Sequence, residues 1–371
     1  MNVLHYSGLH TSDKYGGLER WFIEFAKQCG EKKIGVYLSY TGVMPENVEL
    51  MDTYKSVGLN VILTPKDKND LLQTIKQYDI DIVFFHFVEP FEEPVFVKKH
   101  TQCKIVCFLH CHNYYSSLSW KNDLKILLGV SVYRFKYFFS QFYVDKFVAV
   151  SKAVANQHEK FFFLQSHKVE CCYLGTQKLL LKRKQDNSTP VICCIACHGD
   201  YKGLDVLIRA TKLLKERNLS FVVWQVGGGM VFNKGRDTDA LKKLVIELNV
   251  DDVFFWLGIR NDVAELLDKV DIYVQPSRRE AISLTVAEAM MHGLPIVASK
   301  VDGLPEYVET GRTGYLYENN DPSLLADKLQ LLIEDKSQRI IMGKRGYQKI
   351  NSDRFDITAN ISRLINECCK Y

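Results

Sequence analysis

The chain has 371 residues, of which 47% are hydrophobic and 25% charged, and its formal net charge is only +4. This composition is ordinary for a globular protein, and the length exceeds what one hydrophobic core usually supports, so two domains are expected. The small net charge does not support nucleic-acid binding, and no apolar run approaches the ~20 residues that a membrane-spanning helix requires.

In chain order, the first half alternates short apolar runs with amphipathic stretches. Helices are predicted between several of the runs, the first at residues 18–29, and Ser151 is a suitable N-cap for a helix after the last run. Strands are predicted at residues 2–6, 34–39, 61–64, 82–86, 104–110 and 147–150. Residues 177–190 are polar and rich in lysine, which is typical of an interdomain linker.

A second alternating series follows this linker. Strands are predicted at residues 191–197, 221–226, 253–257, 270–275 and 296–298, and helices at 204–217, 239–248, from 283 onward and at 355–369. Alternation in both halves predicts an α/β protein with two parallel-sheet, Rossmann-like domains, residues 1–176 and 190–350, facing a cleft.

The most informative segment is 276–290, in which two carboxylates lie eight positions apart where a loop passes into a helix. If the segment were helical throughout, Glu280 and Glu288 would lie about 12 Å apart. The helix start would direct free backbone N–H groups at the loop, an anion site formed by Ser283, Leu284 and Thr285. The pattern suits a ligand with phosphate in its middle and hydroxyl-rich groups at both ends, such as a nucleotide sugar.

This order of Glu, seven residues, Glu, helix, Gly-x-Pro and strand, in residues 276–309, resembles the donor-site signature of glycosyltransferase family 4. These are retaining, glycogen-synthase-like (group 1) enzymes, and the similarity in organisation extends over nearly the whole chain. The resemblance implies a GT-B fold in which residues 1–176 bind the acceptor, residues 190–350 bind the donor, and a last helix, 355–371, crosses back to the first domain. It also implies that Glu288 binds the ribose hydroxyls and Glu280 the transferred sugar.

Further donor-side candidates follow the strands. Gly16 and Gly17 precede the first helix, where the family has a glycine pair near the donor phosphates, although a tight turn is the alternative. Lys202 could neutralise a diphosphate leaving group, or be a solvated surface lysine. Gly228 and Arg260 follow two further strands, where a nucleobase could lodge.

The sequence departs from the family at three places. The arginine expected a few residues before Lys202 is absent, because that stretch reads Cys197-His198-Gly199; His198, Arg278 or Arg279 are candidates to replace its charge. Ala281 and Ser283 stand where the family usually has glycine, which demands a less permissive backbone there.

Histidines form a third group. His110 ends a predicted strand, as in the family, where this side chain approaches the donor sugar. His86 ends the preceding strand and His112 lies two residues beyond His110, so both are acceptor-side candidates, with a structural role as the alternative.

A metal site is not predicted. Cys194 and Cys197 have Cys-x-x-Cys spacing, but no second pair completes four ligands.

Residues 114–146 are dense in aromatic and basic side chains, which fits either a helix lying on an anionic membrane surface or an ordinary helix with core aromatics. An odd count of eleven cysteines, with no signal peptide at the N-terminus, favours reduced thiols and a cytoplasmic location, with the inner membrane face as a peripheral site.

The resulting hypothesis is a retaining glycosyltransferase that moves a hexose or N-acetylhexosamine from a nucleotide diphosphate sugar, with UDP expected, to an acceptor hydroxyl. The acceptor would be a glycan or lipid-linked glycan in bacterial surface polysaccharide or glycolipid assembly, no metal or other cofactor would be needed, and no nucleic-acid partner is expected. Its expected catalytic residues are Glu280, His110 and Lys202. The alternatives are a non-catalytic nucleotide-sugar-binding subunit, favoured by the missing arginine, and a nucleotide-sugar epimerase; a nicotinamide oxidoreductase is disfavoured because Gly227–Gly229 lacks the required spacing.

Overall fold

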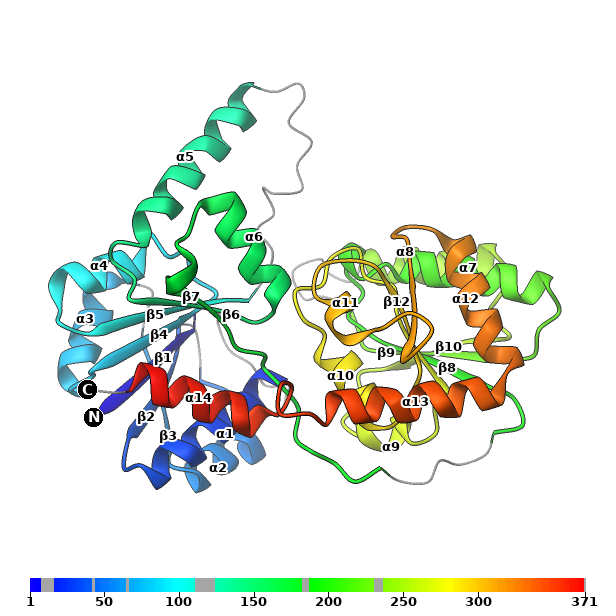
Figure 1. Cartoon of the computed structure of the whole chain (residues 1–371), viewed down its shortest axis with the longest axis horizontal. Helices are drawn as coiled ribbons and strands as arrows, with labels where there is room; N and C mark the ends of the chain where they lie inside the picture. The colour runs from blue at the N-terminus through cyan, green and yellow to red at the C-terminus, as the bar shows by residue number, and fades with distance from the viewer. Residues whose placement is uncertain are drawn as a thin grey trace. The chain divides into compact units, whose positions relative to one another are not determined.

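The computed structural model describes residues 1–7, 17–41, 44–64, 67–110, 124–181, 187–229 and 236–369. The chain folds as two compact units (Figure 1). Unit 1 consists of Met1–Gly175 together with Ile357–Tyr371, and unit 2 of Thr176–Asp356.

Unit 1 is built on a seven-stranded sheet in the order β3-β2-β1-β4-β5-β6-β7, and all of its neighbouring strands pair in parallel. The strands are β1 (Asn2–Ser7), β2 (Gly35–Tyr40), β3 (Leu59–Leu63), β4 (Ile82–His86), β5 (Lys104–Leu109), β6 (Lys146–Ala149) and β7 (Val169–Cys171). All five side chains of the central strand β4 are buried. A continuous apolar strand covered on both faces is typical of a parallel sheet.

The helices of unit 1 begin with side-chain caps at several places. Asn47, Asp67 and Ser151 each accept a hydrogen bond from a backbone N–H of the helix that follows, which confirms the cap expected at Ser151. The helices are α1 (Gly17–Glu31), α2 (Val48–Ser56), α3 (Lys68–Gln77), α4 (Glu93–His100), α5 (Leu124–Ser140) and α6 (Lys152–Phe162).

The last helix, α14 (Ile357–Cys368), packs beside α1 in unit 1, although the preceding 181 residues belong to unit 2 (Figure 1). Its apolar stripe, which includes Ile361 and Leu364, is buried. Gln28 Nε2 on α1 donates to the Thr358 carbonyl at 3.0 Å. The expected return of the last helix to the first domain is therefore confirmed.

Unit 2 carries a six-stranded parallel sheet in the order β10-β9-β8-β11-β12-β13. Its strands are β8 (Val191–Ile195), β9 (Val222–Val226), β10 (Phe254–Gly258), β11 (Ile272–Gln275), β12 (Ile296–Ser299) and β13 (Gly314–Tyr317). Its helices are α7 (Leu204–Glu216), α8 (Arg236–Glu247), α9 (Val263–Leu267), α10 (Leu284–Met291), α11 (Leu304–Tyr307), α12 (Pro322–Glu334) and α13 (Lys336–Ile350).

These two sheets confirm the α/β class and the Rossmann-like, parallel arrangement in both halves. Sequence reasoning did not find the edge strands β7 and β13, of three and four residues, because such short runs carry little periodicity. The strand expected at residues 191–197 ends at Ile195, so Cys197 lies in the loop that follows.

Candidate functional site

Unit 2 places its candidate residues where the order of its strands reverses. From β8 the sheet continues to β9 and β10 on one side and to β11, β12 and β13 on the other. Lys202 follows β8 in a 3₁₀ turn, and Glu280 follows β11. Open parallel sheets bind ligands outside the carboxyl ends of the strands at such a reversal, so these two loops form the expected ligand site.

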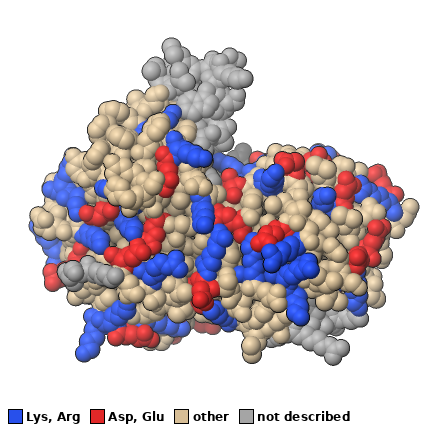
Figure 2. Space-filling view, viewed as in Figure 1, with Lys and Arg blue, Asp and Glu red and all other residues tan. Residues whose placement is uncertain are grey.

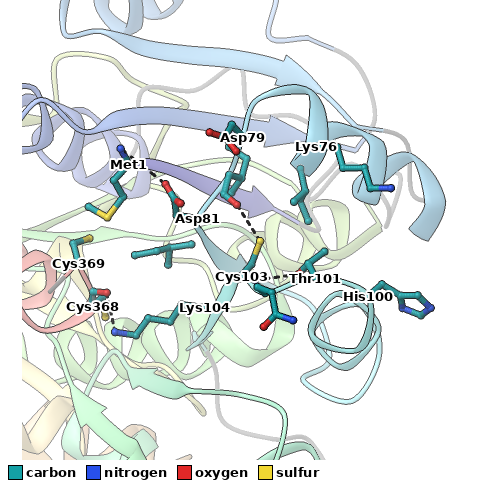
Figure 3. A pocket seen from close by; sticks show the side chains of 14 residues that line it. Met1, Lys76, Asp79, Asp81, His100, Thr101, Cys103, Lys104, Cys368 and Cys369 are labelled. Atoms are coloured by element: carbon teal, nitrogen blue, oxygen red, sulfur yellow. Dashed lines mark hydrogen bonds and ion pairs between the residues drawn. The ribbon is translucent and has the colours of Figure 1, made fainter. Parts of the chain in front are cut away.

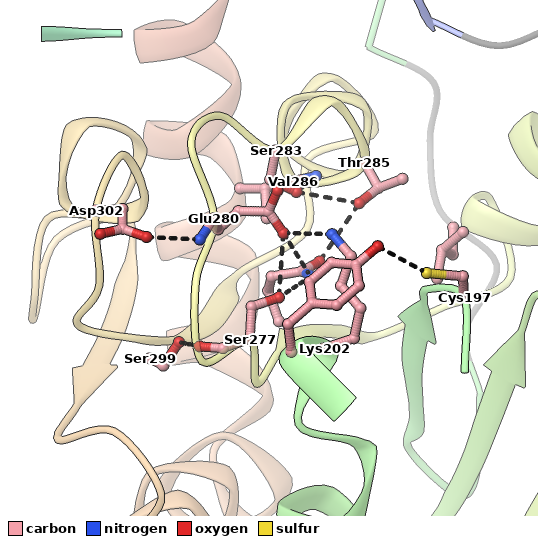
Figure 4. A network of polar contacts seen from close by, with 12 residues as sticks. Cys197, Lys202, Ser277, Glu280, Ser283, Thr285, Val286, Ser299 and Asp302 are labelled. Atoms are coloured by element: carbon pink, nitrogen blue, oxygen red, sulfur yellow. Dashed lines mark hydrogen bonds and ion pairs between the residues drawn. The ribbon is translucent and has the colours of Figure 1, made fainter. Parts of the chain in front are cut away.

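Lys202 and Glu280 form a partly buried ion pair (Figure 4). Lys202 Nζ lies 2.7 Å from Glu280 Oε2, and the two side chains are 18% and 10% exposed. Ser277 Oγ donates to the same oxygen at 3.1 Å and Gln275 Nε2 at 3.3 Å. Glu280 Oε1 has no hydrogen-bond partner within the part of the chain that the structure describes, so it is available to accept from a ligand.

The polar network continues from Gln275 to the start of α10. Gln275 is 1% exposed, and its Oε1 accepts from Thr285 Oγ1 at 3.4 Å and from Tyr273 OH at 3.2 Å. Ser283 Oγ and Thr285 Oγ1 lie 3.2 Å apart. The network therefore joins β11, the loop after it and α10, and it holds Glu280 in one orientation. Sequence reasoning missed Gln275 and Ser277, although a glutamine at the end of a buried strand is the signal that could have found the first.

The loops that carry Lys202 and Glu280 are held against each other by backbone contact. Gly203 has φ +65°, and a Cβ there would lie 2.1 Å from the Pro276 carbonyl oxygen, so any other residue would force the two loops apart. Arg278 N–H donates to the Tyr201 carbonyl at 2.8 Å, and its guanidinium donates to Asp205 Oδ2 at 2.8 Å. These contacts fix the two loops against each other and thereby set the distance between Lys202 and Glu280.

The helix start lies where the sequence predicts it. Ser283 is the N-cap of α10, and its Oγ accepts from the Val286 N–H at 3.3 Å. The N–H groups of Leu284 and Thr285, in the first turn, have no acceptor within the helix. Glu288 lies one turn further along α10 and is partly buried. Residues 276–283 are not helical, so the 12 Å separation expected for a continuous helix does not apply.

None of the candidates for the missing arginine is shown to replace it. His198 is 4% exposed, and its two ring nitrogens contact Thr238 Oγ1 at 2.7 Å and Gln225 Oε1 at 3.0 Å. Arg278 is engaged by Asp200 and Asp205. Arg279 is exposed. Ala281 and Ser283 are not among the residues with positive φ, so the loop accommodates both without left-handed strain.

The other predicted donor residues of unit 2 lie at the same edge of the sheet but outside this network. Gly228 follows β9, and its carbonyl accepts from the His198 N–H at 2.9 Å. Arg260 follows β10 and is paired with Asp262 at 2.6 Å in an exposed ion pair that raises the pKa of the guanidinium.

In unit 1 the strand order reverses between β1 and β4, and the predicted histidines gather there. His86 Nδ1 lies 2.8 Å from His110 Nε2, and His86 Nε2 lies 3.0 Å from the Nδ1 of His5, a residue that sequence reasoning missed. Phe87, with φ +57°, stacks its ring on His110 at 4.2 Å. Gly17 opens α1 beyond β1, whereas Gly16 and His112 lie outside the described residues.

A cavity of about 500 Å³ in unit 1 lies at the opposite edge of the sheet (Figure 3). Its lining includes Asp81, just before β4, and Lys104, the first residue of β5, together with Cys368 at the end of α14. None of the predicted site residues lines it. Asp81 accepts from the Asn2 N–H at 2.7 Å and so ties β1 to the turn before β4.

Helix α5 has two different faces. Tyr137 is buried and stacks on Phe162 of α6 at 3.9 Å, whereas Val132, Phe135 and Phe139 are 43% to 63% exposed. In Figure 2 the part of α5 that is not drawn grey shows mostly uncharged side chains on this face. The aromatic segment thus provides both core and surface residues. Its part at 114–123 lies outside the described residues, and no described helix is long and apolar enough to cross a membrane.

Comparison with known proteins identifies two adjoining family regions. Residues 15–177 match the family described as Glycosyltransferase Family 4, and residues 177–349 match Glycosyl transferases group 1. An uncharacterized glycosyltransferase of Methanocaldococcus jannaschii is 26% identical over 83% of this chain and 80% of its own length. The D-inositol 3-phosphate glycosyltransferase of Corynebacterium aurimucosum is 34% identical over 52% of this chain, which spans only 47% of that relative.

Solved structures agree in fold. An Anabaena protein crystallised with UDP superposes with a TM-score of 0.81 over 100% of both chains, at 18% identity. A glycosyltransferase from Rickettsia africae superposes with a TM-score of 0.78, over 99% of this chain and 97% of its own, also at 18% identity. These similarities confirm the expected GT-B fold.

Proposed function

Because the chain belongs to the group 1 glycosyltransferases, we propose that unit 2 binds a nucleotide diphosphate sugar, with UDP as the nucleotide, and that the protein transfers its hexose or N-acetylhexosamine to an acceptor hydroxyl with retention. The UDP complex of the Anabaena structural neighbour supports the choice of nucleotide. The observation that carries the proposal is the Lys202–Glu280 pair at the strand reversal of unit 2.

The geometry suggests how the two ends of such a donor would be bound. Lys202 uses one of its three N–H donors on Glu280, which leaves two for diphosphate oxygens, and the first-turn N–H groups of Leu284 and Thr285 favour anions. Glu280 Oε1 would accept from a sugar hydroxyl, and Glu288 from the ribose. His110 and Gly17 belong to unit 1, and their assignments to the donor stay predictions.

Chemistry would then depend mainly on charge stabilisation of the leaving diphosphate and on orientation of the sugar. Retention implies that the acceptor attacks from the side of the leaving group, whose phosphate oxygen takes the acceptor's proton. Lys202 and the helix start supply positive charge here, so the proposal needs no metal ion. Transfer that persists in EDTA is the expected result.

Nucleotide binding provides the direct test. UDP and UDP-sugars should raise the melting temperature of the full chain, whereas GDP-mannose and ADP-glucose should raise it less. Lys202→Met should reduce the UDP effect, because it removes the cation that faces the diphosphate. Lys215→Met is the matched control, since Lys215 pairs with Asp252 in the same unit but is exposed. Equal stabilisation of both variants by UDP would contradict the site, and binding without transfer to any acceptor would favour the non-catalytic subunit.

We also propose that the exposed face of α5 docks on an anionic membrane, where a lipid-linked acceptor would lie. Residues 124–144 contain Lys125, Arg134 and Lys136 but no Asp or Glu, and exposed Phe135 and Phe139 are suited to the interface. The protein should sediment with vesicles containing phosphatidylglycerol and less with pure phosphatidylcholine. The double variant Phe135→Ser/Phe139→Ser should lose this binding, and Leu331→Ser in unit 2 should not; unchanged sedimentation of the first variant would refute the surface.

A further inference from the structure

Three histidine rings form a row from the core of unit 1 to its edge. His5 lies on β1, His86 ends β4 and His110 follows β5, and these strands are neighbours in the sheet. His5 Nδ1 lies 3.0 Å from His86 Nε2, and His86 Nδ1 lies 2.8 Å from His110 Nε2. His5 and His86 are fully buried, whereas His110 is partly exposed.

The row is uncharged near neutral pH. Burial lowers the pKa of His5 and of His110 to about 3, and it holds the pKa of His86 well below the usual histidine range, with its two histidine neighbours adding to the effect. A neutral imidazole carries one N–H donor and one acceptor nitrogen. Each contact in the row therefore needs a donor on one ring and an acceptor on the other.

Two proton arrangements satisfy both contacts. In the first, all three protons lie on Nδ1, so that His5 donates to His86 and His86 donates to His110. In the second, all three lie on Nε2, and donation runs inward from His110 to His5. The two differ at the ends of the row: the first leaves a lone pair on His5 Nε2 and a proton on His110 Nδ1, and the second reverses both.

The buried end of the row distinguishes the two arrangements. His5 Nε2 and Trp21 Nε1 are both buried without a hydrogen-bond partner among the described residues, and the two rings lie 5.6 Å apart at 84°. The indole nitrogen is a donor only. The phenyl rings of Phe25 and Phe84, at 4.5 and 4.9 Å from His5, carry no conventional acceptor. A lone pair on His5 Nε2 is therefore better accommodated than a second buried N–H.

We propose that His5 and His86 are positioning residues that hold His110 in the tautomer whose Nδ1 carries the proton. His110 Nε2 is occupied by His86, and within the described residues no group bonds to its Nδ1. Phe87 and Phe108 stack on the ring, at 4.2 and 5.5 Å, and restrict its rotation. His110 then offers a fixed, neutral N–H donor to a ligand oxygen, such as a sugar hydroxyl, and is not a base. This last step rests on the proposed function, whereas the tautomer does not.

The tautomer can be measured directly on the ¹⁵N-labelled full chain at pH 7.5. Long-range ¹H–¹⁵N correlation spectra distinguish protonated from unprotonated ring nitrogens, and His110→Gln assigns the signals of His110. The expected result is a proton on Nδ1 in all three rings. A proton on His110 Nε2, or a mixture of both forms, in the unsubstituted protein would overturn the proposal.

Substitutions of His5, at the buried end of the row, test whether this residue sets the tautomer of His110. His5→Leu removes the donor to His86, so His110 should become a mixture of tautomers, whereas His5→Asn retains an N–H donor and should preserve the Nδ1 form. Phe25→Leu is the matched control, because Phe25 packs on the same ring without joining the row. Retained cooperative melting checks the fold of each variant. A folded His5→Leu protein with unchanged His110 signals would refute the coupling.

Steady-state kinetics test the role of the His110 Nδ1–H group as a hydrogen-bond donor to the ligand. His5→Leu should lower kcat for sugar transfer about tenfold while the KM for the UDP-sugar changes less than about twofold, and His5→Asn should recover most of the rate. An unchanged kcat in His5→Leu would refute the positioning role. Absence of transfer by the unsubstituted protein would instead count against the proposed function, and the NMR result would still decide the tautomer.

Discussion

At Glu280, one carboxylate oxygen is occupied and the other is open. Oε2 accepts from Lys202, Ser277 and Gln275, whereas Oε1 has no partner in the described parts of the chain. A carboxylate restrained in this way loses little rotamer freedom when it binds a hydroxyl, so it can orient a sugar at small entropic cost. The ion pair therefore serves mainly to orient the Glu280 carboxylate and contributes little to the free energy of unfolding.

Glu280→Gln tests this interpretation at the residue scale. The amide keeps the shape of the side chain but removes the charge that holds Lys202, so kcat for transfer should fall about 100-fold, while UDP binding should change less than about threefold. Steady-state kinetics and UDP titration measure the two effects. Glu318→Gln is the control, because Glu318 forms a Lys–Glu pair with Lys300 on the exposed surface of the same unit; equal losses in both variants would contradict the assignment.

At the scale of elements, the site depends on two loops that approach through backbone. The turn Asp200–Lys202 ends at Gly203, which packs on the Pro276 carbonyl in the loop before α10. Arg278 crosses from the second loop to the first and bonds Asp205 at the start of α7. The position of Lys202 relative to α10 is therefore a property of loop packing and not of either helix.

Gly203→Ala should disrupt this packing. Its Cβ would meet Pro276 O at 2.1 Å in a left-handed conformation, so the free energy of unfolding should fall by about 3 kcal/mol or more. UDP stabilisation should weaken as well, because Lys202 is displaced. Gly311→Ala separates the two causes: Gly311 has φ +78° but nothing within 4 Å of the added Cβ, so it should cost only about 1–2 kcal/mol. Similar losses in chemical denaturation would contradict the packing argument.

At the scale of the whole molecule, each unit repeats one plan. In both sheets the strand order reverses once, β1 against β4 and β8 against β11, and the polar candidates lie beyond the carboxyl ends of those strands. The chemistry at the two reversals differs. Unit 1 has buried neutral histidines there, and unit 2 has a lysine and a carboxylate.

Acid should destabilise unit 1 through its histidine row. The folded-state pKa of His5 is lowered to about 3, so between about pH 6.5 and 3 the unfolded chain binds a proton that the folded chain does not, and stability falls as the pH falls. Each such histidine should cost about 1.4 kcal/mol by pH 5.5. Urea titrations at pH 7.5 and 5.5 measure how much the free energy of unfolding falls between these two pH values. This fall should be about 1.4 kcal/mol smaller for His5→Leu than for the unsubstituted protein. A pH dependence of stability in His5→Leu that equals that of the unsubstituted protein would contradict the prediction.

Much of the fold followed from local patterns in the sequence. Apolar runs between amphipathic stretches predicted most strands of two parallel sheets, because covered strands are apolar on both faces and their helices on one. Ser151 is predicted as an N-cap because a hydroxyl caps free N–H groups wherever the helix lies in the fold. The helix start at residues 283–285 is predicted from the passage of a loop into a helical pattern. The carboxylate segment 276–290 is also evident in the sequence alone.

What the tertiary structure alone decided is which of these pieces meet. Lys202 and Glu280 are 78 positions apart and pair because β8 and β11 are neighbours in the sheet. His5 joins His86 because β1 pairs with β4, and nothing near His5 in the sequence indicates that row. The periodicity of apolar residues in the sequence indicates which residues are buried. The order of the strands in the sheet determines which residues become neighbours, and that order follows from the packing of the whole unit.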